Sequence, residues 1–373
     1  MVERDVLADA VGWVARALPA RPPSPVLNGM RIRATEEDGG RVRLSSFDYE
    51  VSAKAEVAAD VEHPGDVLVS GKLLADMAKL LPAKPVSFTL EGSRVVVKCG
   101  ASTFTLLTMN LEDFPALPSL PGWVGSIQAG ALAHAVEQVA VAATRDETLP
   151  MLTGVRVEIE GEIVTLLATD RYRLAIRELP WRPATPGLSR VALVRAKTLR
   201  DVARAFSPTE EVQVSLTAPG IVDIIGFAAA GRETTSLLID GEYPQVRNLL
   251  PDSFEASATL NLHDLIEAVR RVSLVAERKT PVQIVLAEGE AVLNAGTGDD
   301  AQASETLEAV VRGDETTVAF NPQYLLDGLN AMDTPDVRIS MNTITRPVLF
   351  QGERDGELVS DYRYLLVPIR FAV

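Results

Sequence analysis

The sequence predicts an α+β protein that consists of three tandem copies of one type of domain. Two observations carry this prediction. A pattern of one amphipathic helix followed by alternating strands returns about every 120 residues, which is an ordinary domain length. Proline-rich segments also stand near the ends of the first two copies. A chain of 373 residues suits two or three domains better than one.

The three copies open alike, each with an amphipathic helix, a polar break and an alternating strand. They begin RDVLADAVGWVARALP at Arg4, AGALAHAVEQVAVAATR at Ala129 and NLHDLIEAVRRVSLV at Asn261. Apolar residues recur at the spacing of one helix face, as at Leu7 and Val11. The strands that follow read VLNGMRIR, MLTGVRVEIE and VQIVLAE. Their alternation of apolar and polar residues predicts strands with one buried face.

The second half of each copy repeats this pattern in VLVSGKLLADMAKLL, VALVRAKTLRDVARAF and TVAFNPQYLLDGLNAM. The repeat is too long for an open solenoid and favours separate α+β domains. Two helices are therefore predicted in each copy, over residues 3–18, 71–81, 129–145, 197–206, 262–279 and 321–332. Proline resists helix interiors and central strands, so PALPSLPG (115–122) and LLPDSF (249–254) indicate linkers. The expected domains are 1–122, 123–251 and 252–373.

Composition excludes several classes of protein. The chain has no run of about 18 apolar residues that would span a membrane. Its start, MVERDVLADAV, is charged where a signal peptide needs an apolar core, so we expect a cytoplasmic protein. The single cysteine, Cys99, fits a reducing compartment. His63, His134 and His263 have no cysteine nearby, so neither a zinc site nor another cofactor is expected.

The net charge of −15 argues against tight binding to DNA, because contacts to phosphate need lysine and arginine. Charge is distributed unevenly, however. The six predicted helices carry twelve basic and ten acidic residues, so the acidity lies in strands and loops. Two interpretations stay open: a weakly basic helical face turned toward DNA, or ordinary solvated helix faces of mixed charge.

A dense polar motif, LLATDRYRLA (166–175), has two interpretations. Asp170, Arg171 and Arg173 could form an acid–base or phosphate site of a nucleotide-handling enzyme. Alternatively, Asp170 caps a turn between two strands, which is favoured because Asp48 occupies the comparable place in the first copy. The glycine-rich GTGDD (296–300) falls at the same turn of the third copy and lacks the Lys-Ser/Thr of a phosphate loop. No nucleophile elbow or metal-binding His-Glu pair is visible, so catalysis has little support.

Taken together, four motifs in this threefold repeat resemble the bacterial DNA polymerase III beta subunit, the sliding-clamp family. They are LLATDRYRLA (166–175), IDGEYPQVRNLLP (239–251), NPQYLLDGL (321–329) and YLLVPIRF (364–371). The phrasing FDYEVSA (47–53) looks actinobacterial. The resemblance covers nearly the whole chain. It implies a non-catalytic head-to-tail homodimer that encircles duplex DNA, with helices lining a ring and antiparallel sheets outside. The implied partners are the polymerase III alpha subunit, the clamp loader and other proteins with clamp-binding peptides. A slider needs only weak, sequence-blind contacts, which is compatible with the net charge.

The resemblance also implies a pocket between the second and third domains in which apolar walls accept partner peptides. Arg173 and backbone groups would fix the orientation of the peptide. For contacts to DNA the resemblance implies Arg21, after the first helix, and Lys197, at the start of a helix. Carried over position by position, the pocket residues are Leu152, Thr169, Arg171, Tyr172, Arg173, Leu174, Pro244, Asn248, Leu249, Leu365, Val367, Pro368, Ile369 and Arg370.

This chain departs from the family pattern at several positions. Val367 stands where methionine is frequent, Asn248 where a basic residue is frequent, and Phe371 where leucine is frequent. A β-branched residue in place of flexible methionine would stiffen the pocket. The departures allow a second hypothesis, a divergent clamp copy that tolerates an inhibitor directed at this pocket. A scaffold of the same fold that does not encircle DNA is a third.

Overall fold

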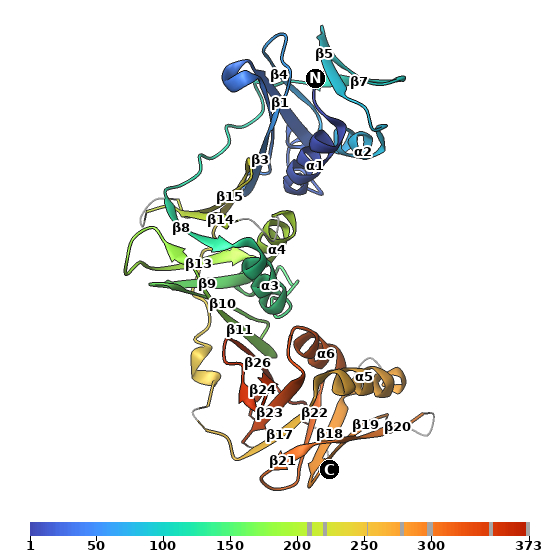
Figure 1. The fold of residues 1–373 in the computed structure, drawn as a ribbon, viewed down its shortest axis with the longest axis vertical. Helices are drawn as coiled ribbons and strands as arrows, with labels where there is room; N and C mark the ends of the chain where they lie inside the picture. The colour runs from blue at the N-terminus through green and yellow to red at the C-terminus, as the bar shows by residue number, and fades with distance from the viewer. Residues whose placement is uncertain are drawn as a thin grey trace. The chain divides into compact units, whose positions relative to one another are not determined.

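The computed structural model divides into two compact units. Figure 1 shows its helices and strands, coloured along the chain. Unit 1 contains Met1–Gly130, Trp181–Pro186 and Lys197–Leu238, and unit 2 contains Ala131–Pro180, Gly187–Ala196 and Ile239–Val373. Each unit is described by itself. The structure describes residues 1–206, 211–218, 222–251, 253–276, 280–296, 301–342 and 346–370, with the side chain of Asp38 left out.

Unit 1 is organised around one twelve-stranded sheet in which every described pair of neighbours is antiparallel. The strand order is β12-β8-β14-β15-β16-β3-β2-β1-β4-β7-β6-β5. Its elements are α1 (Arg4–Val14), β1 (Gly29–Thr35), β2 (Arg41–Phe47), β3 (Val51–Ala58), β4 (Gly65–Ser70), α2 (Gly71–Leu80), β5 (Val86–Glu91), β6 (Arg94–Cys99), β7 (Ser102–Met109), β8 (Trp123–Gln128), β12 (Arg182–Pro183), most of α4 (Ala196–Ala205), β14 (Glu211–Leu216), β15 (Ile224–Ala229) and β16 (Arg232–Leu237).

The first and second copies of the repeat share this sheet. Strand β16 of the second copy pairs with β3 of the first, so that Thr235 lies opposite Ser52. The two buried hydroxyl groups lie 2.6 Å apart and share a hydrogen bond. On β1 and β2 the apolar Met30, Ile32 and Leu44 are buried on the face that carries α1 and α2, as the period of two residues requires.

Unit 2 contains two antiparallel sheets. The larger has the order β13-β9-β10-β11-β26-β24-β23-β17-β21 with β25 paired to β24, and the smaller has the order β20-β19-β18-β22. The elements are most of α3 (Ala129–Ala140), β9 (Gly154–Glu160), β10 (Ile163–Thr169), β11 (Arg173–Pro180), β13 (Ser189–Arg195), β17 (Ala256–Asn261), α5 (Leu262–Val272), β18 (Val282–Ala287), β19 (Glu290–Ala295), β20 (Ala303–Glu308), β21 (Val310–Arg312), β22 (Thr316–Phe320), α6 (Pro322–Asn330), β23 (Asp336–Met341), β24 (Val348–Arg354), β25 (Glu357–Leu358) and β26 (Tyr362–Leu366).

Within the described residues, six α-helices lie where the sequence predicts them, and the α+β fold with antiparallel sheets is confirmed. Several helices are shorter than predicted. Helix α3 ends at Ala140 rather than near residue 145, because the backbone N–H of Thr144 turns away to bond the carbonyl of Leu152 at 2.9 Å. Helix α5 ends at Val272 and continues as one 3₁₀ turn, Ser273–Val275, while predicted residues 277–279 lie outside the described residues.

The shorter helices correct the predicted charge distribution. Arg145 lies beyond α3 and Arg16 lies in a 3₁₀ turn after α1. The six described α-helices therefore carry eight basic and eight acidic residues and are neutral as a set. Any attraction of the helices for DNA must come from where the charges stand and not from an excess of them. None of the helices in the described ranges is long and apolar enough to cross a membrane.

Candidate peptide-binding surface

The turn between β10 and β11 is held by its own side chains. The Asp170 carboxylate accepts hydrogen bonds from the backbone N–H groups of Tyr172 and Arg173, both at 3.1 Å. The Thr169 hydroxyl donates to the carbonyl of Arg173 at 2.6 Å and accepts from the N–H of Arg171 at 3.2 Å. Arg171 adopts a left-handed φ of 80°. Asp and Thr are suited to such turns because their short side chains reach the backbone two or three residues on.

The first copy of the repeat uses the same turn chemistry. The Asp48 carboxylate accepts from the backbone N–H of Glu50 at 2.9 Å and of Val51 at 2.6 Å, and Tyr49 has a φ of 75°. The predicted equivalence of Asp48 and Asp170 as turn residues is therefore confirmed. The corresponding stretch of the third copy, residues 297–300, lies outside the described residues.

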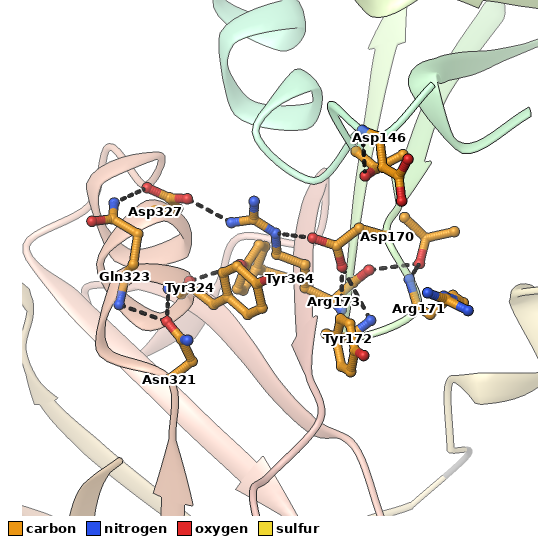
Figure 2. Close-up of polar contacts among 12 residues, drawn as sticks. Asp146, Asp170, Arg171, Tyr172, Arg173, Asn321, Gln323, Tyr324, Asp327 and Tyr364 are labelled. Carbon is orange, nitrogen blue, oxygen red and sulfur yellow. Dashed lines mark hydrogen bonds and ion pairs between the residues drawn. The ribbon is translucent and has the colours of Figure 1, made fainter. Parts of the chain in front are cut away.

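The side chain of Arg173 ties this turn to helix α6 (Figure 2). Its Nε donates to the Asp170 carboxylate at 2.9 Å, and its Nη1 donates to the Asp327 carboxylate at 2.6 Å. The guanidinium carbon lies 4.3 Å from the centre of the Tyr324 ring, a cation–π contact. Only 9% of the Arg173 side chain is exposed. Burial lowers the pKa of Arg173, but Tyr364 and the two carboxylates raise it by more, so the group stays cationic.

Helix α6 presents Tyr324 and Asp327 to Arg173 because its first turn is firmly capped. The Asn321 side chain accepts from the N–H groups of Gln323 and Tyr324 at 2.9 and 3.1 Å. One turn later, the Gln323 amide donates to Asp327 at 2.7 Å, which leaves the other carboxylate oxygen for Arg173. The buried Tyr364 hydroxyl donates to the Tyr324 carbonyl at 2.7 Å and fixes the helix to β26.

The C-terminal segment runs directly beside the turn. Strand β26 pairs antiparallel with β11, with Leu365 opposite Leu174. Beyond the strand, the N–H of Val367 donates to the carbonyl of Tyr172 at 2.8 Å, and the N–H of Ile369 donates to the carbonyl of Ala319 at 2.7 Å. These contacts place residues 365–369 and the TDRYR motif in one surface, although they are almost two hundred residues apart in sequence.

A mostly aliphatic cluster lies beneath this surface. It includes Leu152, Leu174 and Leu365, which the sequence assigned to the pocket, and also Tyr243 and Val246. Around the cluster, partly exposed apolar side chains reach solvent. Their exposed fractions are 53% for Tyr172, 46% for Leu249, 36% for Val367 and 37% for Ile369. Exposed aromatic and aliphatic side chains beside a packed apolar floor are the usual composition of a peptide-binding site.

The segment that carries Pro244, Asn248 and Leu249 is anchored to β9 by an ion-pair network. Arg247 hydrogen-bonds to the Glu158 carboxylate, and the Nε of Arg156 donates to the same carboxylate at 2.6 Å. Burial would raise the pKa of Glu158, but the hydrogen bonds from the two arginines hold it below its ordinary value. The charged carboxylate therefore fastens the 3₁₀ turn Arg247–Leu249 to the sheet.

Unit 2 contains all the predicted pocket residues. Thr169, Leu174 and Leu365 are buried, as are Leu152 and Pro368. Arg173 is mostly covered. The other predicted pocket residues are exposed to solvent, namely Arg171, Tyr172, Pro244, Asn248, Leu249, Val367, Ile369 and Arg370. The residues predicted to touch DNA lie in unit 1: Arg21 is exposed in a loop, and Lys197 on α4 pairs with Asp201 at 3.1 Å.

Three residues that build the surface were not predicted from the sequence: Tyr324, Asp327 and Tyr364. Two of them were detectable in NPQYLLDGL, because positions three apart lie on one face of a helix. Tyr364 stands in the C-terminal motif YLLVPIRF, but no pattern in the sequence shows which helix its hydroxyl reaches.

Three family models match the chain in succession. They describe the N-terminal domain of the DNA polymerase III beta subunit at residues 1–118, its central domain at 126–245 and its C-terminal domain at 247–370. The chain belongs to the family of the bacterial DNA polymerase III beta subunit. Members of this family are sliding clamps, which act as processivity factors, so this clamp is not an enzyme and Asp170 with its neighbouring arginines has no catalytic assignment.

Curated relatives and solved structures agree with this assignment. The beta sliding clamp of Streptomyces coelicolor is 50% identical over 100% of this chain and 99% of its own length. The "beta sliding clamp homolog GriR" of Streptomyces muensis is 42% identical over 99% of this chain and 98% of its own. Among solved structures, the clamp of Pseudomonas aeruginosa bound to griselimycin has a TM-score of 0.90 at 25% identity, covering 99% of this chain and 98% of that chain.

Proposed function

We propose that this sliding clamp works as a head-to-tail homodimer that encircles duplex DNA and tethers the replicative polymerase to it. The observation that carries the proposal is the succession of three beta-subunit domains in order along the chain, together with 50% identity to a clamp over the full chain. Processivity then follows from topology, so the neutral helices and the net charge of −15 are no obstacle to function.

The direct test is a primer-extension assay with polymerase III core, clamp loader and a primed single-stranded circle. Addition of this clamp should lengthen the products made in one binding event, because a tethered polymerase rebinds before it diffuses away. Product lengths that stay the same with and without the clamp would contradict the proposal.

Ring closure is supported by apolar side chains that each unit leaves exposed. Unit 1 exposes Phe104 and Leu107 on β7, by 40% and 67%, close to the sheet edge that ends in β5. Unit 2 exposes Leu274 by 85% in the turn after α5. Exposed apolar side chains in two different units of one chain suit a heterologous contact, which generates a ring when the rotation closes. The edge strand β5 is covered by Val2 at Val86, and an edge left unpaired is otherwise a liability for a soluble protein.

We assign the peptide-binding site of this clamp to the surface formed by the turn after β10, the segment after β16 and the C-terminal segment. Leu152, Leu174 and Leu365 would form the floor. Partner side chains such as leucine or phenylalanine would pack between Tyr172 and Val367, and backbone groups would orient the peptide. The fully assigned set comprises Leu152, Thr169, Arg171, Tyr172, Arg173, Leu174, Pro244, Asn248, Leu249, Leu365, Val367, Pro368, Ile369 and Arg370.

The surface is tested with a fluorescent peptide copied from the clamp-binding motif of the polymerase alpha subunit. Leu174→Ala and Arg173→Ala should both weaken binding, the first by leaving a cavity in the floor and the second by releasing the turn. Both variants should remain dimeric by light scattering. Undiminished peptide affinity in both variants would overturn the assignment.

Other parts of the proposal concern the domains and the DNA. We propose domain boundaries at 1–122, 123–251 and 252–373, and DNA contacts through Arg21 and Lys197. Exposure of both side chains is compatible with weak phosphate contacts, although Lys197 would first have to exchange its partner Asp201. Since its relatives are replication proteins, we place this clamp with the chromosome in the cytoplasm.

A second candidate function is that of a divergent copy that tolerates an inhibitor of the ordinary clamp. The Pseudomonas aeruginosa clamp was solved with griselimycin bound, which shows that a clamp of this fold takes that ligand. The 50% identity to the beta sliding clamp of Streptomyces coelicolor over the full chain favours an ordinary clamp. Titration of griselimycin onto this protein and onto the other clamp of the same cell decides the matter, because equal affinities exclude tolerance.

A further inference from the structure

Two arginines of the proposed peptide-binding surface carry charge that the clamp itself does not pair. The fourteen residues assigned to that surface include three arginines and no aspartate or glutamate. Arg173 is bound to Asp170 and Asp327. Arg171 and Arg370 are exposed, and neither guanidinium forms an ion pair or hydrogen bond with another described residue. The surface therefore presents unpaired positive charge beside its apolar side chains.

Arg171 lies at the edge of the apolar part of this surface. The carbonyl of the next residue, Tyr172, accepts a hydrogen bond from the N–H of Val367 at 2.8 Å. Figure 2 shows the side chain of Arg171 extending away from Arg173 and Asp327. A partner peptide packed between Tyr172 and Val367 would therefore have this cation at its flank.

The equivalent turn of the first copy shows that the turn itself does not need an arginine. Tyr49 has the same left-handed conformation, with a φ of 75° against 80° for Arg171. Its ring packs edge-on against Phe47, with 5.8 Å between the ring centres. The first copy thus uses this position for a contact within the chain, whereas the second copy leaves the side chain to solvent or a partner. A left-handed φ is costly for a residue with a side chain, and such a cost is often retained at functional sites.

Asp146 is a nearby carboxylate that does not neutralise Arg171 by contact. Its side chain, in the loop after α3, accepts hydrogen bonds from the hydroxyl of Thr148 at 2.7 Å and from the N–H of Thr148 at 3.0 Å. These bonds lower the pKa of Asp146, and the positive charge of Arg171 lowers it further. The two side chains attract each other without forming an ion pair, so Arg171 can still pair with a closer carboxylate.

We propose that Arg171 makes this surface selective for partner peptides that carry a carboxylate directly beside their apolar anchor residues. The guanidinium would form an ion pair with an aspartate or glutamate of the peptide, while leucine or phenylalanine anchors pack against Tyr172 and Val367. The inference rests on the peptide-binding surface proposed above and adds the chemistry of the peptide that this surface prefers. An ion pair at a solvated rim changes affinity by a modest factor, so it decides preference among partners more than total affinity.

The test uses the full-length clamp and two pairs of fluorescein-labelled peptides, followed by fluorescence anisotropy. All are copies of the clamp-binding segment of the polymerase alpha subunit. Aspartate or asparagine stands directly before the apolar anchors in one pair and directly after them in the other. In one pair the unmodified clamp should bind the aspartate peptide about fivefold more tightly than the asparagine peptide. Arg171→Gln should reduce this ratio to about one, and Arg171→Lys should retain most of it. Raising the ionic strength from about 0.05 to 0.3 M should lower the ratio for the unmodified clamp.

Control variants separate this ion pair from the general charge of the clamp. Arg190→Gln removes the same charge at an exposed position on β13 and should leave the ratio unchanged. Asp146→Asn should raise the ratio, because it removes a competing negative charge while its amide oxygen can still accept from Thr148. Arg171→Gly, which adopts the left-handed φ freely, replaces the glutamine variant if that variant does not fold.

The outcomes distinguish failure of this inference from failure of the proposed surface. Equal affinity for the aspartate and asparagine peptides in both pairs would overturn the inference and leave the surface intact. A preference for aspartate that persists in Arg171→Gln and Arg171→Gly would also overturn it, because another cation would then be responsible. If no peptide binds saturably to the unmodified clamp, the proposed surface is wrong and the inference falls with it.

Discussion

At the scale of single residues, Arg173 has a different role from the one its sequence suggests. The motif suggested an arginine that orients a bound peptide. In the structure the side chain is 9% exposed, and its Nε and Nη1 are bound to Asp170 and Asp327. A guanidinium held in this way positions the turn, and Tyr172 on that turn carries the Val367 segment. We therefore expect Arg173 to support peptide binding through geometry more than through contact.

Replacement of Asp327 tests this positioning role without touching the proposed surface. Asp327→Asn removes the charge that holds Nη1 of Arg173 from the α6 side. We predict about tenfold weaker binding of the clamp-binding peptide, a loss of roughly 1.4 kcal/mol, because the turn is no longer fixed to the helix. The measurement is fluorescence anisotropy at constant ionic strength.

Asp264→Asn on α5 is the matched control, since it changes the net charge equally at an exposed position. Its peptide affinity should equal that of the unmodified clamp. If Asp327→Asn behaves like the control, Arg173 is not a positioning residue.

At the scale of elements, the positions of the helices were predicted correctly from local sequence patterns. The pairing of strands that lie far apart in the sequence was not predicted. Apolar periodicity located the helices, and the structure shows that Asn321 before Pro322 and Asn261 before Leu262 cap their starts. The end of α3 depends instead on the bond from Thr144 to Leu152, which no periodicity records. No periodicity in the sequence records the pairing of β11 with β26 either. Family resemblance predicted the residues of the candidate site. Only the folded structure shows that Tyr324, Asp327 and Tyr364 hold that site in place.

The 3₁₀ turn Arg247–Leu249 provides a prediction about pH. Its anchor, Glu158, has a lowered pKa in the folded state. Folding stability from this group is therefore present above the ordinary glutamate pKa and is lost as the pH falls through the lowered folded-state value. We predict that Glu158→Gln lowers the midpoint of thermal unfolding at neutral pH and flattens its decline toward acid. Parallel melting curves of the two proteins over that range, with a constant offset, would contradict this account.

At the scale of the whole molecule, a sliding clamp needs two properties: a closed ring and weak contact with what it encloses. The neutral set of helices agrees with the second property. The exposed apolar side chains on β7 and after α5 are available to form the contact that would close a ring. The exposed side chains on β7 lie in the first copy of the repeat and Leu274 lies in the third.

Leu274→Asp tests ring closure. A carboxylate at a contact that would bury leucine has to be desolvated without a partner, so we predict dissociation into subunits of 40.1 kDa at concentrations where the unmodified clamp is dimeric. Val191→Asp on β13, at a residue that is 55% exposed, serves as the control and should remain dimeric. Light scattering after size exclusion gives both masses. A dimer that persists in Leu274→Asp would place the interface elsewhere.

The central claim is that this protein encircles DNA, and topology tests it most directly. The clamp is loaded onto nicked circular DNA by a clamp loader, freed of unbound protein by gel filtration, and followed after a restriction enzyme cuts the circle. We predict that the clamp stays with intact circles and is lost from the linear product, because a ring slides off a free end. Loss at the same rate from circles and linear DNA would contradict encirclement.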